Sequence, residues 1–111
     1  MNLFELPAGI HREEIADILW QTEALRVERI VSWGQVSPEG FWYDQEEDEW
    51  VSVLEGAGEV EFSDGTKTRL GRGDALFLPA HVRHRVSFTS KEPPCVWLCV
   101  FGKGDGRADS R

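Results

Sequence analysis

Short apolar runs separated by turn-forming residues are the main pattern of this chain. The stretches Trp50–Leu54, Ala75–Leu78 and Cys95–Phe101 are mostly apolar and too short for typical helices, which favours buried strands. Between them, Asp64-Gly65 marks a tight hairpin turn, because this pair tolerates positive φ angles. Further strands are expected at Arg26–Trp33, Glu59–Phe62, Lys67–Leu70 and His84–Thr89. This pattern predicts an all-β protein, built as an antiparallel sandwich or barrel.

One short helix is expected near the N-terminus, over Glu13–Leu19 within the segment His11–Gln21. The two glutamates at its start suit the first turn of a helix, where backbone N–H groups are unpaired. An apolar stripe with i, i+3, i+4 spacing follows, made of Ile15, Ile18 and Leu19. We expect the helix to pack this stripe against the outside of the sheet.

The length of 111 residues allows one domain and leaves no room for a second core. We divide it into an N-terminal arm with the short helix at 1–26, a barrel at 27–101 and a tail at 102–111. The tail has no apolar residue to anchor it except a single alanine, and we expect it to be disordered.

Charge and hydropathy exclude several classes of partner. The formal net charge is −8, which argues against binding to nucleic acid or to an anionic membrane surface. No run of about 18 apolar residues is present, so no membrane-spanning helix is expected. The first residues also lack the basic and apolar regions of a secretory signal.

The two cysteines indicate a reducing compartment. Cys95 and Cys99 fall on one face of a predicted strand, about 13 Å apart at about 3.3 Å per residue. A disulfide requires Cα atoms within about 7 Å, so these two thiols cannot pair with each other. Free, buried thiols fit a cytoplasmic protein.

A carboxylate at the start of an apolar strand is the first candidate for chemistry. Glu49 has the same strand parity as Val51 and Val53, which we expect to face inward. A buried carboxylate is costly unless a cation, a metal or hydrogen-bond donors accompany it. His84 is one candidate partner, so an ion pair with Glu49 competes with a metal as the explanation.

Two spaced motifs carry a family resemblance. In the first, Glu49 is followed after six residues by Gly56; in the second, Gly73 is followed after five residues by Pro79, and His84 comes later. This pattern, over roughly residues 27–101, resembles the small single-domain cupins. The resemblance implies a double-stranded β-helix, or jelly-roll barrel.

The resemblance also implies positions for metal ligands, of which this chain matches only part. Glu49 and His84 take the places of the family's glutamate and last histidine, and His81 stands in place of a glycine. The two histidines of the family's first motif are absent. Depending on the spacing to Glu49, their places fall either to Trp42 and Asp44 or to Tyr43 and Gln45.

From these positions we derive a candidate site. Mixed oxygen and nitrogen ligands would suit a divalent ion such as zinc, manganese, iron or nickel, although two missing imidazoles predict weak binding. The catalytic candidates are Glu49 and His84, acting as general acid or base. Ligand-binding candidates are Trp42, Tyr43 and Gln45, and the metal-ligand candidates are Asp44, Glu49, His81 and His84.

Two function classes follow from this site. The first is a cupin with a small-molecule pocket inside the barrel, acting as a divalent-metal-dependent enzyme on a small polar substrate. The alternative is a non-catalytic cupin that senses a ligand or serves assembly without a metal. In either case we expect a homodimer, because a small barrel leaves sheet edges that favour pairing.

Overall fold

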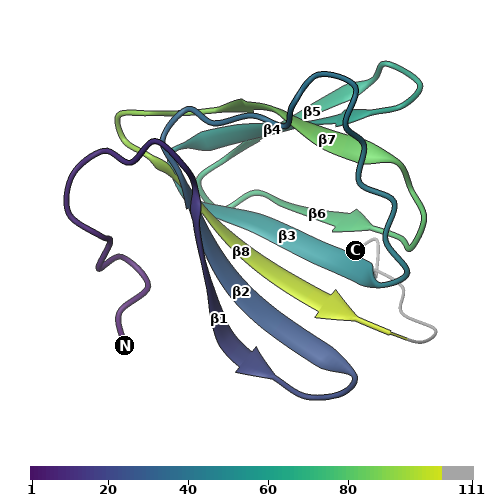
Figure 1. The fold of residues 1–111 in the computed structure, drawn as a ribbon, viewed down its shortest axis with the longest axis horizontal. Helices are drawn as coiled ribbons and strands as arrows, with labels where there is room; N and C mark the ends of the chain where they lie inside the picture. The colour runs from purple at the N-terminus through teal and green to yellow at the C-terminus, as the bar shows by residue number, and fades with distance from the viewer. Residues whose placement is uncertain (104–111) are drawn as a thin grey trace.

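The computed structural model describes residues 1–103, which form eight strands and no helix. Two sheets face each other, as Figure 1 shows, with the smaller sheet lying over part of the larger one. The strands are β1 (Ile15–Gln21), β2 (Leu25–Ser32), β3 (Asp48–Glu55), β4 (Ala57–Phe62), β5 (Lys67–Gly71), β6 (Ala75–Leu78), β7 (His84–Thr89) and β8 (Cys95–Gly102). The all-β class and most strand positions are therefore as predicted.

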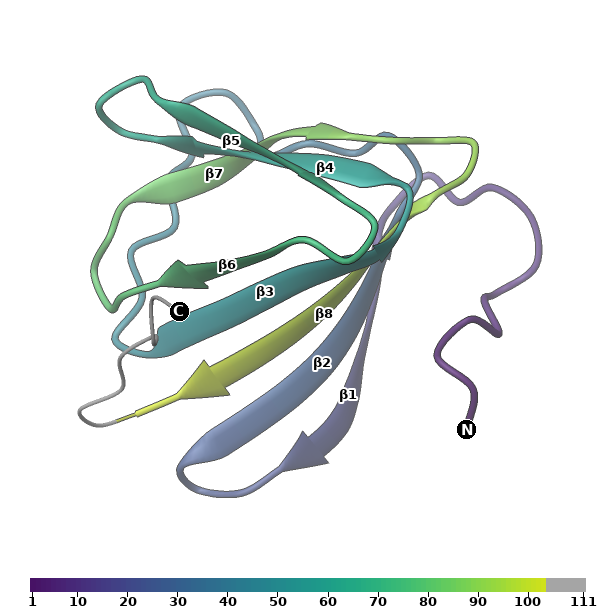
Figure 2. The same cartoon turned by 180° about the vertical axis from the view of Figure 1, so that it is seen from behind.

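Every strand pair in the two sheets is antiparallel. The larger sheet has the order β1-β2-β8-β3-β6 and the smaller the order β5-β4-β7. The same order can be followed from behind in Figure 2. This two-sheet arrangement fits the predicted jelly roll, but hydrogen bonding does not close the described strands into one barrel.

The predicted N-terminal helix is wrong. Ile15–Gln21 is β1, which pairs along β2 from Ile15 opposite Val31 to Gln21 opposite Arg26. Side chains alternate between half-buried and exposed along most of β1, as a strand at a sheet edge requires. Pairing with β2 overrode the short helical stripe, because isolated helices of this length are unstable in water. Residues 1–103 contain no helix that is long and apolar enough to cross a membrane.

The main core lies between the two sheets. It consists of buried side chains from β3, β4, β5, β6 and β8: Val51, Val53, Val60, Leu70, Leu78, Cys95, Trp97, Cys99 and Phe101. Both cysteines are free and buried, as predicted. Trp50 departs from expectation because its parity turns it to the outer face, where it is 41% exposed.

A second apolar cluster lies on the outer face of the larger sheet. Val31, Trp33 and Val96 are buried there, and Leu6 of the N-terminal segment packs against them. Arg29, which is 5% exposed, fixes this segment by donating to the Leu3 and Glu5 carbonyls. The segment before β1 thus covers part of a sheet face that would otherwise meet water.

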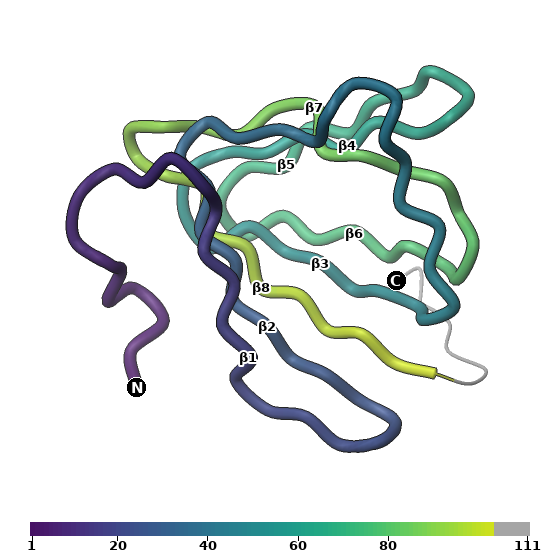
Figure 3. The backbone as a smooth tube through the Cα atoms, viewed as in Figure 1, coloured from purple at the N-terminus to yellow at the C-terminus, as the bar shows by residue number. Residues whose placement is uncertain are grey.

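The long connection from β2 to β3 extends the smaller sheet. It runs along the β7 edge of that sheet, as the tube in Figure 3 shows. Ser37 N donates to Val86 O, and Tyr43 and His84 exchange backbone hydrogen bonds in an isolated antiparallel bridge. This connection therefore places residues just before β3 next to the start of β7.

The C-terminal boundary differs slightly from the predicted tail. Gly102 is the last residue of β8, opposite Leu25 of β2 and Asp48 of β3. The rest of the predicted tail, from residue 104, lies outside the described residues.

Candidate active site

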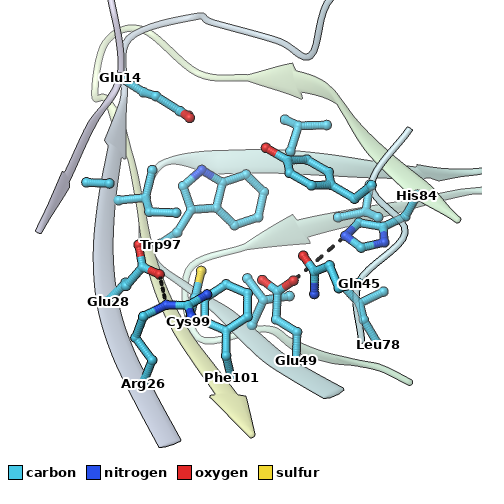
Figure 4. Close-up of a pocket in the computed structure, with 16 residues that line it drawn as sticks. Glu14, Arg26, Glu28, Gln45, Glu49, Leu78, His84, Trp97, Cys99 and Phe101 are labelled. Carbon is cyan, nitrogen blue, oxygen red and sulfur yellow. Dashed lines mark hydrogen bonds and ion pairs between the residues drawn. The ribbon is translucent and has the colours of Figure 1, made fainter. Parts of the chain in front are cut away.

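A cavity of about 300 Å³ lies between the two sheets. Its size is at the small end of the range for ligand pockets, about 300–1,000 Å³. Figure 4 shows polar groups at two ends of the cavity, with Cys99 and Phe101 between them. The lining residues are Glu14, Ala16, Arg26, Glu28, Ile30, Tyr43, Gln45, Glu49, Val51, Val60, Leu78, His84, Val86, Trp97, Cys99 and Phe101.

Glu49 and His84 face each other at one end of this cavity (Figure 4). Glu49 Oε1 lies 3.7 Å from His84 Nε2. The two residues are 7% and 5% exposed. Glu49 comes from the start of β3 and His84 from the start of β7, so each sheet supplies one of the two groups. The predicted convergence of these side chains is present.

Backbone contacts between two loops hold these groups in place. His81, in the connection from β6 to β7, has a φ of 65° and donates its N–H to Gln45 O at 2.7 Å. Ala80 N donates to the Asp48 carboxylate at 2.8 Å. These bonds, together with the bridge between Tyr43 and His84, tie the start of β7 to the segment that enters β3.

One tautomer of His84 fits its surroundings. Nδ1 lies 3.0 Å from Val82 O, and a carbonyl only accepts hydrogen bonds, so Nδ1 carries a hydrogen. Burial lowers the pKa of His84, while the Val82 carbonyl opposes this shift. The neutral ring therefore presents the lone pair of Nε2 to Glu49. The Tyr43 ring stacks on the imidazole with centroids 5.2 Å apart, which fixes the plane of the ring.

The environment of Glu49 favours its protonated form. Burial raises the pKa of this carboxyl from 4.5 to about 7, against a lowering by hydrogen bonds from Cys99 and Gln45. Although the distance to His84 is that of an ion pair, burial drives both partners toward their neutral forms. The pair thus holds a proton that can move near neutral pH, as general acid–base catalysis requires.

Burial disfavours the thiol beside this pair as a nucleophile. Burial raises the pKa of Cys99 well above its usual value, and the neighbouring Glu49 charge raises it further. Cys95 is similar, with a pKa raised by burial to about 12. Since only the thiolate attacks, a raised pKa makes both thiols poor nucleophiles, and both side chains pack in the core.

The fold distinguishes between the two pairs of residues that could take the places of the first motif's histidines. Tyr43 and Gln45 line the cavity with Glu49 and His84, whereas Trp42 and Asp44 do not. Trp42 instead lies below the Arg83 guanidinium, 5.9 Å from ring centroid to Cζ. Among the predicted ligand-binding residues, only Tyr43 and Gln45 therefore reach the cavity.

The four predicted metal ligands do not converge. Asp44 Oδ1 and His81 Nδ1 form a separate pair at 2.8 Å, with side chains 51% and 65% exposed. Within residues 1–103, no three His, Cys, Asp or Glu side chains gather as a metal site requires. Glu49 and His84 supply one carboxylate and one imidazole, fewer than the three protein ligands of typical catalytic zinc sites. The residues present do not fit a tightly held metal.

Sequence reasoning missed the other end of the cavity. Arg26 and Glu28 of β2 form an ion pair there (Figure 4), and the guanidinium lies 4.2 Å from the Phe101 ring centroid. Glu14, before β1, lines the cavity apart from both polar ends. The alternation of side chains along β2 could have indicated this end, since it places Arg26, Glu28 and Ile30 on one face of the strand. The register of β2 on β8 could not be read from it.

Comparison with known proteins assigns the family. The sequence model described as a cupin domain matches residues 32–101. The chain belongs to the cupin family. No match was found for this cupin among curated proteins.

Several solved structures resemble this cupin. One is a protein of Ralstonia eutropha JMP134 provisionally identified as a mannose-6-phosphate isomerase, with 42% identity and a TM-score of 0.88 over 94% of this chain and 97% of that one. KdgF from Halomonas sp. has 26% identity and a TM-score of 0.66 over 87% of each chain. A cupin superfamily protein of Desulfitobacterium hafniense DCB-2, 18% identical, has a TM-score of 0.73 over 86% and 83% of the two chains, and supports the fold alone.

Proposed function

We propose that this cupin is an enzyme that moves a proton on a small polyhydroxylated substrate bound in the cavity. The observation that carries the proposal is that Glu49 and His84 face each other, buried, across one end of that cavity. A pKa of about 7 lets Glu49 act as either acid or base at neutral pH. The resemblance to a protein provisionally identified as a sugar phosphate isomerase supports this reaction class.

The walls of the cavity suit a sugar-like molecule. Trp97, Phe101 and Tyr43 supply flat apolar surfaces, and Gln45 and Glu49 supply hydrogen-bonding groups beside them. Such a combination binds the apolar face of a polyol and its hydroxyl groups at the same time.

The two residues have separate roles in an isomerisation. Ionised Glu49 takes the proton from the carbon beside a carbonyl and returns it to the carbonyl carbon. His84 takes the proton of the adjacent hydroxyl through Nε2 and delivers it to the carbonyl oxygen. The result is a shift of the carbonyl by one carbon with no net gain or loss of protons.

Deuterium exchange tests this proposal. We expect the protein to exchange the C2 proton of D-mannose or the C1 protons of D-fructose in D₂O, measured by proton NMR. Glu49→Gln and His84→Ala should each lower the rate by about 100-fold or more, the usual contribution of a general acid or base. The exposed pair of Asp44 and His81 offers controls, since Asp44→Asn and His81→Ala remove a carboxylate and an imidazole outside the cavity.

The same experiment separates the competing hypotheses. Exchange that survives dialysis against EDTA supports the proposal, whereas exchange that requires added zinc, manganese, iron or nickel supports a metal-dependent enzyme. Ligand binding without any exchange would contradict the proposal and favour a non-catalytic, ligand-sensing cupin.

A further inference from the structure

The cation at the second polar end of the cavity is already neutralised by the protein. Arg26 is the lone lysine or arginine among the residues that line the cavity, and its Nε lies 2.5 Å from Glu28 Oε2. Its two terminal nitrogens lie 3.3 and 3.4 Å from the two carboxylate oxygens of Glu47. Two carboxylates thus surround one guanidinium, which leaves the group with no uncompensated positive charge.

The rest of the lining adds negative charge. Glu14 also lines the cavity, while burial holds both Glu49 and His84 toward their neutral forms. The buried Arg29 and the half-buried Arg85 act elsewhere. Arg29 binds Asp17 and the N-terminal segment, and Arg85 binds Glu61 and Ser37 O.

We propose that Glu28 and Glu47 exclude anionic ligands from this cavity, so that the ligand is uncharged where it meets Arg26. The inference rests on the proposed function in so far as the cavity is the ligand site. A phosphate or carboxylate placed beside Arg26 would meet two carboxylates at close range in a partly desolvated space, where like charges repel strongly. A sugar hydroxyl meets no such penalty and can donate to Glu28, which lines the cavity.

The position of the charges makes this selection local. The side chains of Arg26, Glu28 and Glu47 are 25%, 14% and 22% exposed, so their interactions are only partly screened by solvent. The Arg26 guanidinium also stacks on Phe101, which holds it in one place. Removing the two carboxylates should therefore leave a fixed, unpaired cation that attracts anions.

Titration with D-mannose 6-phosphate tests the inference. Isothermal titration calorimetry of the unchanged protein should detect no binding with a Kd below about 1 mM. The Glu28→Gln/Glu47→Gln variant should bind the phosphate about tenfold or more tightly than the unchanged protein. Adding Arg26→Gln to that variant should abolish the gain, since it removes the freed cation.

A control that is matched in charge to the single variant Glu47→Gln separates this local effect from the overall charge. Glu59→Gln also removes a carboxylate from an arginine, Arg69, but on the smaller sheet and outside the cavity. It should give no gain in binding. If the double variant does not fold by circular dichroism, Glu47→Gln alone provides the same comparison with a smaller gain.

Each contrary result overturns the inference. These results are tight binding of the phosphate to the unchanged protein, no gain in the folded carboxylate variants, a gain that survives Arg26→Gln, or an equal gain in Glu59→Gln. Since binding is measured without turnover, these outcomes are independent of whether Glu49 and His84 exchange protons.

Discussion

Glu49 illustrates how one position in a strand can change the chemistry of a carboxyl group. Glu49 follows three acidic residues that keep contact with solvent. It alone is buried, because its strand parity matches that of Val51 and Val53. Its oxygens face His84, Gln45 and Cys99, none of which carries a full positive charge at neutral pH. Burial therefore decides the protonation of Glu49.

The stability of the protein should report this burial. The folded carboxyl keeps its proton up to about pH 7, while the ordinary pKa is 4.5, so the folded state binds more protons between these values. The contribution of Glu49 to the free energy of unfolding is therefore lost as the pH rises through this window. The loss is about 3 kcal/mol, because each pKa unit corresponds to about 1.36 kcal/mol. Glu49→Gln should be more stable than the unchanged protein at pH 8, and the advantage should shrink toward pH 5.

Urea unfolding at several pH values measures this difference. The exposed carboxyl of Glu39 provides a control, because Glu39→Gln should leave the pH dependence of the unfolding free energy unchanged. Equal stability of Glu49→Gln and the unchanged protein at pH 8 would show that burial does not raise the pKa of this carboxyl.

At the scale of elements, β1 and the segment before it show how distant contacts select local structure. The stripe of Ile15, Ile18 and Leu19 is compatible with one short helix. In the folded protein, however, β2 offers a ladder of hydrogen bonds, and Arg29 of β2 binds both Asp17 of β1 and the N-terminal segment. A helix in this place would have left the β2 edge without a partner.

Loss of Arg29 should loosen this edge. Arg29→Met removes hydrogen bonds from a buried cation to the carbonyls of Leu3 and Glu5 and to Asp17. We expect the free energy of unfolding to fall by about 2–3 kcal/mol, with faster amide hydrogen exchange in β1 by NMR. Arg69→Met is the control, since that side chain is 57% exposed, and its loss should cost within about 1 kcal/mol. Unchanged exchange in β1 would contradict the anchoring role.

At the scale of the whole molecule, β1 leaves one edge of the larger sheet open. β1 pairs with β2 on one side alone in the described residues, and Ile18 and Trp20 on it are 58% and 59% exposed. An open edge with large apolar side chains favours pairing with a second copy.

We therefore expect a homodimer that uses β1. Light scattering at tens of micromolar should give twice the chain mass of 12.6 kDa. If β1 is the contact, Trp20→Glu should give the monomer mass. Trp50→Glu is the control and should leave the dimer intact, because Trp50 lies on β3, away from the β1 edge of the sheet. A monomer mass for the unchanged protein would rule out the dimer.

The sequence predicted the fold better than the site because the two depend on different distances along the chain. Alternation and turn residues set most strands, and parity alone placed Glu49 inward. The choice between Asp44 and Gln45 depended on the bridge from Tyr43 to His84, which joins segments far apart in sequence. Likewise, Arg26 reaches the cavity through its pairing opposite Phe101, a register that no local pattern specifies.

The family match begins at residue 32, whereas Arg26 and Glu28 lie before it and Glu14 earlier still. The part of the chain by which this protein is classified thus contains Glu49 and His84 but only one of the two carboxylates that surround Arg26. On this proposal, two cupins can align throughout that span and still differ in whether they accept an anionic ligand. A substrate name passed from one to the other on the strength of the alignment should be checked first in the two strands that the alignment leaves out.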